Sequence, residues 1–463
     1  MSKKLMRAAA AAMSAGALLT FTACSSGTSG TTAPGGSGTQ ATDCAAYEQY
    51  GDLSGKTISV YTSIASDSEA QPHIDSFKPF EECTGAKVDY EGSREFENQL
   101  PVRVQAGNAP DLAYFPQPGL LQSIVTSYPD AVVKVGADAE ANVDKYYNEA
   151  WKMYGTVDGT YYGIPIGANA KSFVWYSPKM FSDAGYEVPK TWQELMDLTA
   201  KIAADNTDGT TKPWCAGFES GGATGWPATD WVEDMMLRVG TPEQYDQWVG
   251  HEIPFNDPTV IKAIDQAGSI LKNEAYVNGG LGGVSTIATT PFTDAGFPIL
   301  DGTCYMHRMA SFYQANWQEA QADVSVAEDG DVWAFALPAE TADSVPMLVG
   351  GEFAMAFRDA PEVAALQAYL TSPEWSNAKA IATPNGGWLS ANTELDPANL
   401  AKPIDKLSYE LITAEGAVVR FDGSDLMPSA VGAGSFWKEM TDWVALNKST
   451  QDVANAIEAS WPA

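Results

Sequence analysis

Two tryptophans and two charged residues are the first candidates for a ligand-binding site in this 463-residue chain. Trp226 and Trp388 lie in glycine-flanked segments that we expect to be loops. Asp425 could accept hydrogen bonds and Arg308 could donate them, although each could equally form a structural ion pair. Flat aromatic rings beside hydrogen-bonding groups suit a ligand with an apolar face and a rim of hydroxyls, such as a sugar.

Segments that resemble catalytic motifs do not complete them. Residues 217–222 carry a serine among glycines, but no His/Asp pair accompanies it. The glycines at 279–283 neither follow a strand nor open a phosphate-binding loop. Tyrosine pairs at 146–147 and 161–162 lack the His or carboxylate cluster of a ferric site, which favours packing. The 59 carboxylates leave an exported glycoside hydrolase open, because a sequence does not reveal carboxyl separations.

The cysteines indicate disulfides rather than metal. Apart from Cys24, four remain, and an even number in an exported chain predicts two disulfides with three possible connectivities. These residues are Cys44, Cys83, Cys215 and Cys304. No C-x-x-C occurs, and the three histidines are far apart in sequence. We therefore predict neither a metal site nor a cofactor.

Residues 1–23 have the layout of a lipoprotein signal peptide. Lys3, Lys4 and Arg7 precede an apolar run at 8–21, which is too short to span a bilayer core of about 30 Å. This layout is typical of an export signal, and Cys24 after two small residues resembles a bacterial lipobox. Residues 24–43 then form the lipidated cysteine and a nearly uncharged segment that we expect to be a flexible tether. The alternative is an ordinary cleaved signal with a chance cysteine.

Charge and length narrow the partners and the architecture. The formal net charge is −32 at pH 7, which repels nucleic acids and anionic ligands. We therefore expect no nucleic-acid partner and a neutral or cationic ligand. The chain after Cys24 is too long for one ordinary core and suits two domains or lobes.

The hydrophobic pattern alternates between short strands and helices, which predicts an α/β fold. Strands are expected at 57–63, 87–91 and 111–115, separated by helices at 72–84 and 94–106. A second set has strands at 173–176, 214–218 and 304–307, a helix that begins after Thr191, and a helical tail at 436–460. Thr191 and Glu194 form a capping-box pattern. In such sheets ligands bind at the carboxyl ends of strands, here near 62–65 and 114–118.

Three blocks of the sequence resemble the extracellular solute-binding proteins of ABC importers, the maltose-binding-protein-like class, and match best its alpha-glucoside-binding branch. The first block is FEECTGAKV at 80–88, continued by APDL at 109–112. The second runs from GIP at 163–165 through 176 to PKTW at 189–192, and the third from LMP at 426–428 to SFW at 435–437. Their order and spacing extend the resemblance over residues 55–437.

The resemblance implies a two-lobed periplasmic-binding-protein fold, in which each lobe is a mostly parallel sheet flanked by helices. About three crossovers would join the lobes at a hinge. Lobe one would take residues 44–165 and 337–383, and lobe two residues 166–336 and 384–463. The pairs Cys44–Cys83 and Cys215–Cys304 would each close within one lobe. We prefer this pairing, since a bond across lobes would obstruct closure.

The resemblance also implies site residues. Trp437, Phe312 and Phe115 match aromatic sugar platforms of the family, and Glu97 matches an acidic sugar ligand. Gln117 lies beside Pro118 and Gly119, which stand where maltose binders have an Asp-Arg pair. Asn169 stands where they have an acidic residue. These differences retain a site for a neutral polyol but argue against maltose itself.

The implied function is that of a lipid-anchored receptor on the extracellular face of the cytoplasmic membrane. It would bind a carbohydrate, an alpha-glucoside or related oligosaccharide, between the lobes and deliver it to the transmembrane subunits of an ABC permease. The resemblance implies no enzyme activity, and we expect a monomer that meets the membrane only through its lipid. A receptor for a non-sugar solute, such as a peptide or a metal, is the remaining alternative.

Overall fold

The computed structural model describes residues 43–342, 345–414 and 417–462. The predicted signal peptide, Cys24 and the tether up to residue 42 lie outside these residues. Within the described ranges, no helix combines the length and the apolar character that crossing a membrane requires.

A five-stranded sheet forms the centre of the first lobe, with the strand order β2-β1-β3-β13-β6. β1 (Thr57–Thr62) lies between β2 (Lys87–Gly92) and β3 (Leu112–Phe115), and these three strands are parallel. β13 (Phe353–Ala356) and β6 (Gly163–Pro165) complete the sheet. Because β1 and β3 run in the same direction, the segments that follow them meet at one edge of the sheet.

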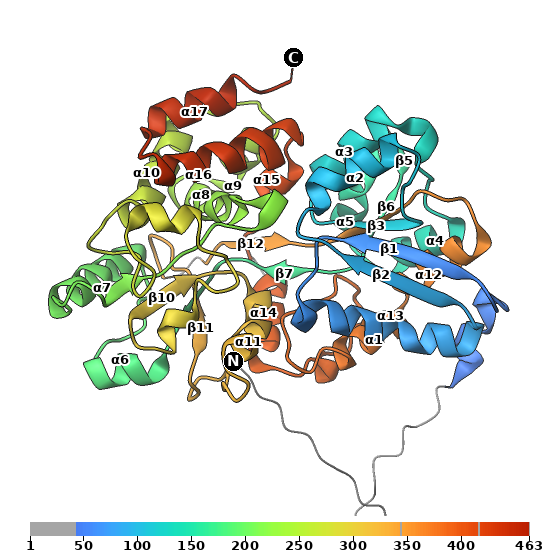
Figure 1. The fold of residues 1–463 in the computed structure, drawn as a ribbon, viewed down its shortest axis with the longest axis horizontal. Helices are drawn as coiled ribbons and strands as arrows, with labels where there is room; N and C mark the ends of the chain where they lie inside the picture. Colours follow the sequence, from blue (N-terminus) through green and yellow to red (C-terminus); the bar gives the residue numbers. More distant parts are fainter. Residues whose placement is uncertain (1–42, 343–344, 415–416, 463) are drawn as a thin grey trace, which may run out of the picture. The chain divides into compact units, whose positions relative to one another are not determined.

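Both faces of this sheet are buried, because alternate side chains of a strand point to opposite faces. Leu112 and Tyr114 of β3 belong to one hydrophobic cluster, whereas Ala113 and Phe115 belong to another. The helices of this lobe pack on these two faces (Figure 1). They are α1 (Asp67–Thr84), α2 (Phe96–Gln105), α3 (Pro118–Ser127), α4 (Ala137–Tyr146), α5 (Glu149–Tyr154), α12 (Pro361–Leu370) and α13 (Pro373–Ile381), and a hairpin of β4 (Thr156–Val157) and β5 (Thr160–Tyr161) follows α5.

A four-stranded sheet with the order β11-β8-β10-β9 forms the centre of the second lobe. Its strands are β8 (Phe173–Tyr176), β9 (Lys212–Trp214), β10 (Cys304–Arg308) and β11 (Trp333–Ala336), so β9 ends earlier than predicted. The surrounding helices are α6 (Pro178–Ala184), α7 (Trp192–Asp205), α8 (Trp226–Val239), α9 (Pro242–Val249), α10 (Pro258–Leu271), α11 (Trp317–Ala320), α14 (Pro403–Thr413), α15 (Gly423–Leu426), α16 (Trp437–Ala445) and α17 (Thr450–Glu458). The capping box predicted at Thr191 and Glu194 is present at the start of α7.

A small three-stranded sheet, β14-β12-β7, forms the hinge. The chain leaves the first lobe after β6, passes through β7 (Asn169–Ala170) and enters the second lobe at β8. It returns from β11 through β12 (Met347–Gly350) to β13, and crosses a third time before β14 (Val419–Phe421). Figure 1 shows β7 and β12 running between the two lobes. The predicted two-lobed α/β fold is confirmed.

Fewer strand pairs are parallel than the resemblance implied. In the second lobe β8 is antiparallel to both β10 and β11, and only β9 and β10 are parallel. In the first lobe β13 is antiparallel to β3 and to β6. The antiparallel pairs arise at the hinge. The chain enters the second lobe at β8 and re-enters the first lobe at β13, and each of these strands is antiparallel to the strands beside it.

The structure joins Cys44 to Cys83 and Cys215 to Cys304, and each disulfide closes within one lobe. The exact lobe boundaries stay a prediction. Leu389, Leu395 and Leu400 pack with the first-lobe cluster, which favours a last boundary near residue 400 rather than at 383–384.

Candidate functional site

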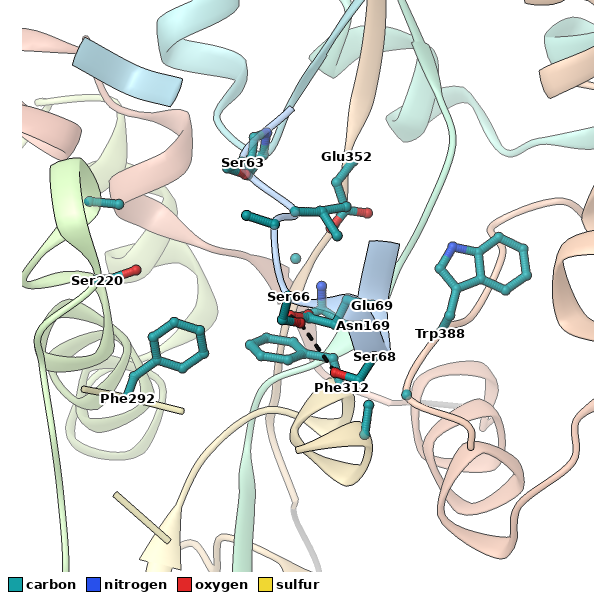
Figure 2. Close-up of a pocket in the computed structure, with 18 of the residues that line it drawn as sticks. Ser63, Ser66, Ser68, Glu69, Asn169, Ser220, Phe292, Phe312, Glu352 and Trp388 are labelled. Atoms are coloured by element: carbon teal, nitrogen blue, oxygen red, sulfur yellow. Dashed lines mark hydrogen bonds between the residues drawn. The ribbon is translucent and has the colours of Figure 1, made fainter. Parts of the chain in front are cut away.

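A cavity of about 420 Å³ lies beside the hinge sheet, and side chains from both lobes line it (Figure 2). Residues 63–65 after β1 and 116–117 after β3 form part of its wall. The cavity therefore lies at the edge of the sheet where the sequence predicted a ligand.

The two lobes touch at the rim of this cavity. Arg94 of the first lobe forms an ion pair with Glu219 of the second at 2.8 Å, and the Gly222 N–H donates to the Arg94 carbonyl. On another side the Ser68 hydroxyl donates to a carboxylate oxygen of Glu319 at 2.6 Å. These contacts join the two lobes beside the cavity.

Eight of the ten residues predicted to bind ligand line the cavity, from both lobes and the hinge. They are Trp437, Phe312, Trp226, Trp388, Glu97, Gln117, Asn169 and Asp425. That these side chains contact a ligand stays a prediction, but the structure gathers them around one space.

Phe115 does not reach the cavity. Its side chain is fully buried in the core behind β3, with its ring 5.7 Å from that of Phe96 and 6.5 Å from that of Phe357. Because alternate side chains of a strand point to opposite faces, Phe115 points to the face of the sheet that α2 and α3 cover. The chain reaches the cavity only after β3 ends, at Pro116 and Gln117.

Arg308 does not line the cavity either, because it is a buried ion-pair partner. At the end of β10 its guanidinium donates to Asp230 at 2.7 Å and to Asp234 at 2.5 Å, and all three side chains are excluded from solvent. Asp234 also pairs with Arg238 at 2.9 Å. The geometry therefore supports a structural ion pair for Arg308 rather than a role as a ligand donor.

Lys171 connects this ion-pair network to the cavity. It follows the hinge strand β7, and its ammonium donates to Asp230 at 3.1 Å and to Asp422. Asp425 lies 3.9 Å from the same nitrogen, and the ring of Trp226 lies 5.3 Å from it. The hinge, helix α8 and the cavity wall therefore share one buried cation.

The network has more carboxyl groups than cations. Asp230, Glu233 and Asp422 place oxygens within 4.8 Å of one another, a spacing that could suit a metal ion. The Lys171 ammonium already supplies positive charge there. Burial and the neighbouring Asp422 raise the pKa of Glu233 and of Asp425 well above their usual range. This shift favours the protonated form of Asp425, which can donate as well as accept a hydrogen bond.

Several buried polar atoms of the cavity wall have no hydrogen-bond partner among the described residues. They are Glu97 Oε2, Gln117 Oε1, Asn169 Oδ1, His73 Nδ1 and Trp388 Nε1. A buried polar atom without a partner costs about 1–3 kcal/mol. These atoms define where a polar ligand would be recognised.

The sequence did not single out several residues that line the cavity. They include Glu69, Arg94, Phe292, Glu319, Glu352 and Lys379. Glu352 follows Gly350 and Gly351, and this pair of glycines was a usable sign of closely approaching backbone. Lys379 carried no comparable sign, because a lysine on a helix is usually exposed.

Comparisons with known proteins agree with this architecture. Residues 61–376 match the family of bacterial extracellular solute-binding proteins, and the chain belongs to that family. The osmoprotective compounds-binding protein GgtB of Synechocystis sp. is 41% identical over 399 residues, which are 85% of this chain and 90% of that protein. The alpha-glucosides-binding periplasmic protein AglE of Rhizobium meliloti is 38% identical over 427 residues, 89% of this chain and 88% of that protein.

Among solved structures, the bacterial solute receptor AcbH has the same fold, with a TM-score of 0.72 at 18% identity over 87% of this chain and 98% of that one. The chain is thus an extracellular substrate-binding protein of an ABC transporter. Its relatives bind solutes and are not enzymes, which confirms that part of the prediction.

We expect Arg308→Met to lower the free energy of unfolding by about 3–5 kcal/mol, because Asp230 and Asp234 would lose their buried counter-charge. Chemical denaturation measures this loss. Arg420→Met is the control, since Arg420 pairs with the exposed Asp246 at 2.6 Å and should cost at most about 1 kcal/mol. Equal small losses in both variants would contradict the structural role of Arg308.

Proposed function

We propose that this protein binds a carbohydrate, an alpha-glucoside or related small oligosaccharide, in the interlobe cavity and delivers it to an ABC importer. The observation that carries the proposal is that aromatic rings line the same cavity as buried polar atoms that have no hydrogen-bond partner among the described residues. The apolar face of a sugar ring can stack on the aromatic rings, and its hydroxyls can form hydrogen bonds with the polar atoms.

The aromatic part of the cavity is built in the second lobe. The rings of Trp226, Phe292 and Phe312 lie 5.1–6.4 Å from one another and support each other's orientation. Trp437 at the start of α16 adds a further ring, and its indole N–H donates to the Ser424 hydroxyl at 3.4 Å. Rings fixed in this way lose little entropy when a ligand stacks on them.

The polar part suits hydroxyl groups. Glu97 and Gln117 come from the first lobe, and the Gln117 amide donates to one Glu97 oxygen at 3.2 Å, which leaves the second carboxylate oxygen for a ligand. Asn169 belongs to the hinge, and Asp425 to the second lobe. A hydroxyl both donates and accepts, so it can pair with each of these groups.

The names of the two relatives support the same class of ligand. One is described as binding osmoprotective compounds and the other as binding alpha-glucosides. Both descriptions are compatible with a small neutral polyol, and the strongly negative net charge of this chain disfavours an anionic solute.

Ligand-driven closure is the proposed mechanism. Glu97 and Gln117 move with the first lobe, whereas Trp226, Asp425 and Trp437 move with the second. A ligand that touches both sets binds the closed state more tightly than the open state, and only this difference shifts the equilibrium. The permease would then recognise the closed form.

The proposal predicts selective stabilisation by sugars. A ligand at 100 times its Kd raises the free energy of unfolding by about 2.7 kcal/mol, so a thermal-shift screen against oligosaccharides, peptides and divalent metals identifies the class. We expect small alpha-glucosides to raise Tm, and peptides and metals to leave it unchanged. A response to peptides or metals alone would refute the proposal.

Trp437→Ala should raise the Kd for the sugar by roughly thirtyfold, because it removes an aromatic ring from the cavity wall.

We also propose that Cys24 carries the lipid anchor, on the basis of the signal layout and the uncharged segment that follows. Two acyl chains on this residue would hold the protein durably at the membrane. Cys24→Ser should remove palmitate labelling and shift the protein from the membrane fraction to an uncleaved or secreted form. A Cys24→Ser protein that stays membrane-bound and labelled would exclude this anchor.

A further inference from the structure

Two carboxyl groups from opposite lobes line the same part of the cavity. Glu97 lies in the first turn of α2, and Asp425 belongs to α15 of the second lobe. The lobes touch beside these residues, because a β-carbon built on Gly119 of α3 would lie 1.9 Å from the Met427 carbonyl oxygen and 3.2 Å from that of Asp425. This close approach requires a glycine. Gln117, two positions before it, is hydrogen-bonded to Glu97.

Glu97 has no counter-charge. One carboxylate oxygen accepts from the Gln117 amide at 3.2 Å, and the other is buried without a partner among the described residues. Within the described ranges no cationic side chain forms an ion pair with it. Burial raises the pKa of Glu97 to about 7. Burial and Asp422 raise the pKa of Asp425 most, and Glu97 adds to that increase. Each of the two carboxyl groups therefore disfavours the ionised form of the other.

The nearby cations of the cavity wall are already paired. Lys171 lies 3.9 Å from Asp425, but its ammonium donates to two other carboxylates. Arg94 pairs with Glu219 at 2.8 Å. Bringing the lobes together thus places two carboxyl groups close to each other without a cation of their own.

Three of the partnerless atoms in the cavity wall are oxygens that only accept. Besides Glu97 Oε2 they are Gln117 Oε1 and Asn169 Oδ1, whose side chains belong to residues that are 5% and 8% exposed. An ammonium has three donors and no acceptor, whereas a hydroxyl donates a single hydrogen. The rings of Trp226 and Trp437 line the same cavity, and the face of an aromatic ring attracts a cation. These groups together suit a positively charged donor.

From this arrangement we propose that the cavity prefers a carbohydrate that carries an amino group, whose ammonium lies between Glu97 and Asp425. The inference rests on the proposed function and names a more specific ligand, a basic alpha-glucoside. The ammonium donates to Glu97 Oε2 and Gln117 Oε1 of the first lobe and to Asp425 of the second. Charge-assisted hydrogen bonds are stronger than neutral ones, so a cation that pairs with both lobes favours closure more than a hydroxyl does.

Calorimetric titration with matched neutral and amino sugars tests this preference. The neutral probes are methyl alpha-glucoside and trehalose, and the amino probes are the derivatives of each in which the hydroxyl at position 2, 3, 4 or 6 is replaced by an amino group. We expect at least one amino probe to bind the wild-type protein roughly tenfold or more tightly than its neutral parent. Glu97→Gln should reduce this ratio to less than about twofold, because an amide has no charge to pair with the ammonium.

Glu95→Gln is the matched control. It removes the same charge from an exposed residue that precedes α2 and does not line the cavity, so it should retain the preference for the amino probe. Asp425→Asn serves as the second variant if Glu97→Gln fails to fold, and it should show the same loss.

Amino probes that bind no more tightly than their neutral parents, or a preference that persists in Glu97→Gln, would overturn the inference while the proposed function stands. Stabilisation by calcium chloride that Glu97→Gln abolishes would assign this part of the cavity to a metal ion and overturn it too. If the wild-type protein binds no probe of either series, the proposed function fails first and the inference with it.

Discussion

The buried ammonium of Lys171 is the interaction on which the arrangement of the site depends. It directly follows the hinge strand β7, donates to Asp230 of α8 and to Asp422 after β14, and lies 3.9 Å from Asp425 in the cavity wall. Arg308 neutralises Asp230 from the other side. Because breaking such a buried network is costly, the hinge and the second-lobe half of the site hold a fixed relation.

This half of the site faces a first-lobe half, which moves relative to it in the mechanism that we propose. Glu97, Gln117 and Trp388 line the cavity from the first lobe, and each has a buried polar atom without a hydrogen-bond partner among the described residues. Both lobes thus contribute to the cavity: the second lobe supplies Trp226, Phe312 and Asp425, and the first lobe supplies Glu97, Gln117 and Trp388. A ligand that satisfies both halves links cavity chemistry to lobe closure, which is what a transport receptor requires.

Local signals in the sequence predicted the elements well. The Thr191 capping box, the strands β1 to β3 and the carboxyl-end location of the cavity all depend on patterns within a few residues. The antiparallel pairing of β8 and β13 was not predictable in this way, because it depends on how the chain re-enters each lobe through the hinge. Cysteine pairing followed only once the lobes were inferred from the resemblance.

Site residues were predictable where a family motif or a glycine-flanked aromatic residue marks them, and less so where strand alternation or packing between distant segments decides. Trp226 and Trp388 line the cavity as expected, although Trp226 is the first residue of helix α8 and does not lie in a loop. Phe115, in contrast, is turned into the core by strand alternation. Arg308 fits a ligand donor by type, but its partners on α8 are distant in sequence. Lys379 escaped notice because its burial arises from the packing of α13 against the cavity, and no periodic pattern encodes that contact.

The proposed mechanism requires that a sugar closes the two lobes around the cavity. Small-angle X-ray scattering measures this closure directly. The protein without residues 1–42 is measured before and after addition of the sugar that stabilises it most in the thermal screen. Closure predicts that the radius of gyration is larger without sugar and decreases when the sugar saturates the site. An unchanged radius of gyration under saturating sugar would contradict closure as the basis of recognition.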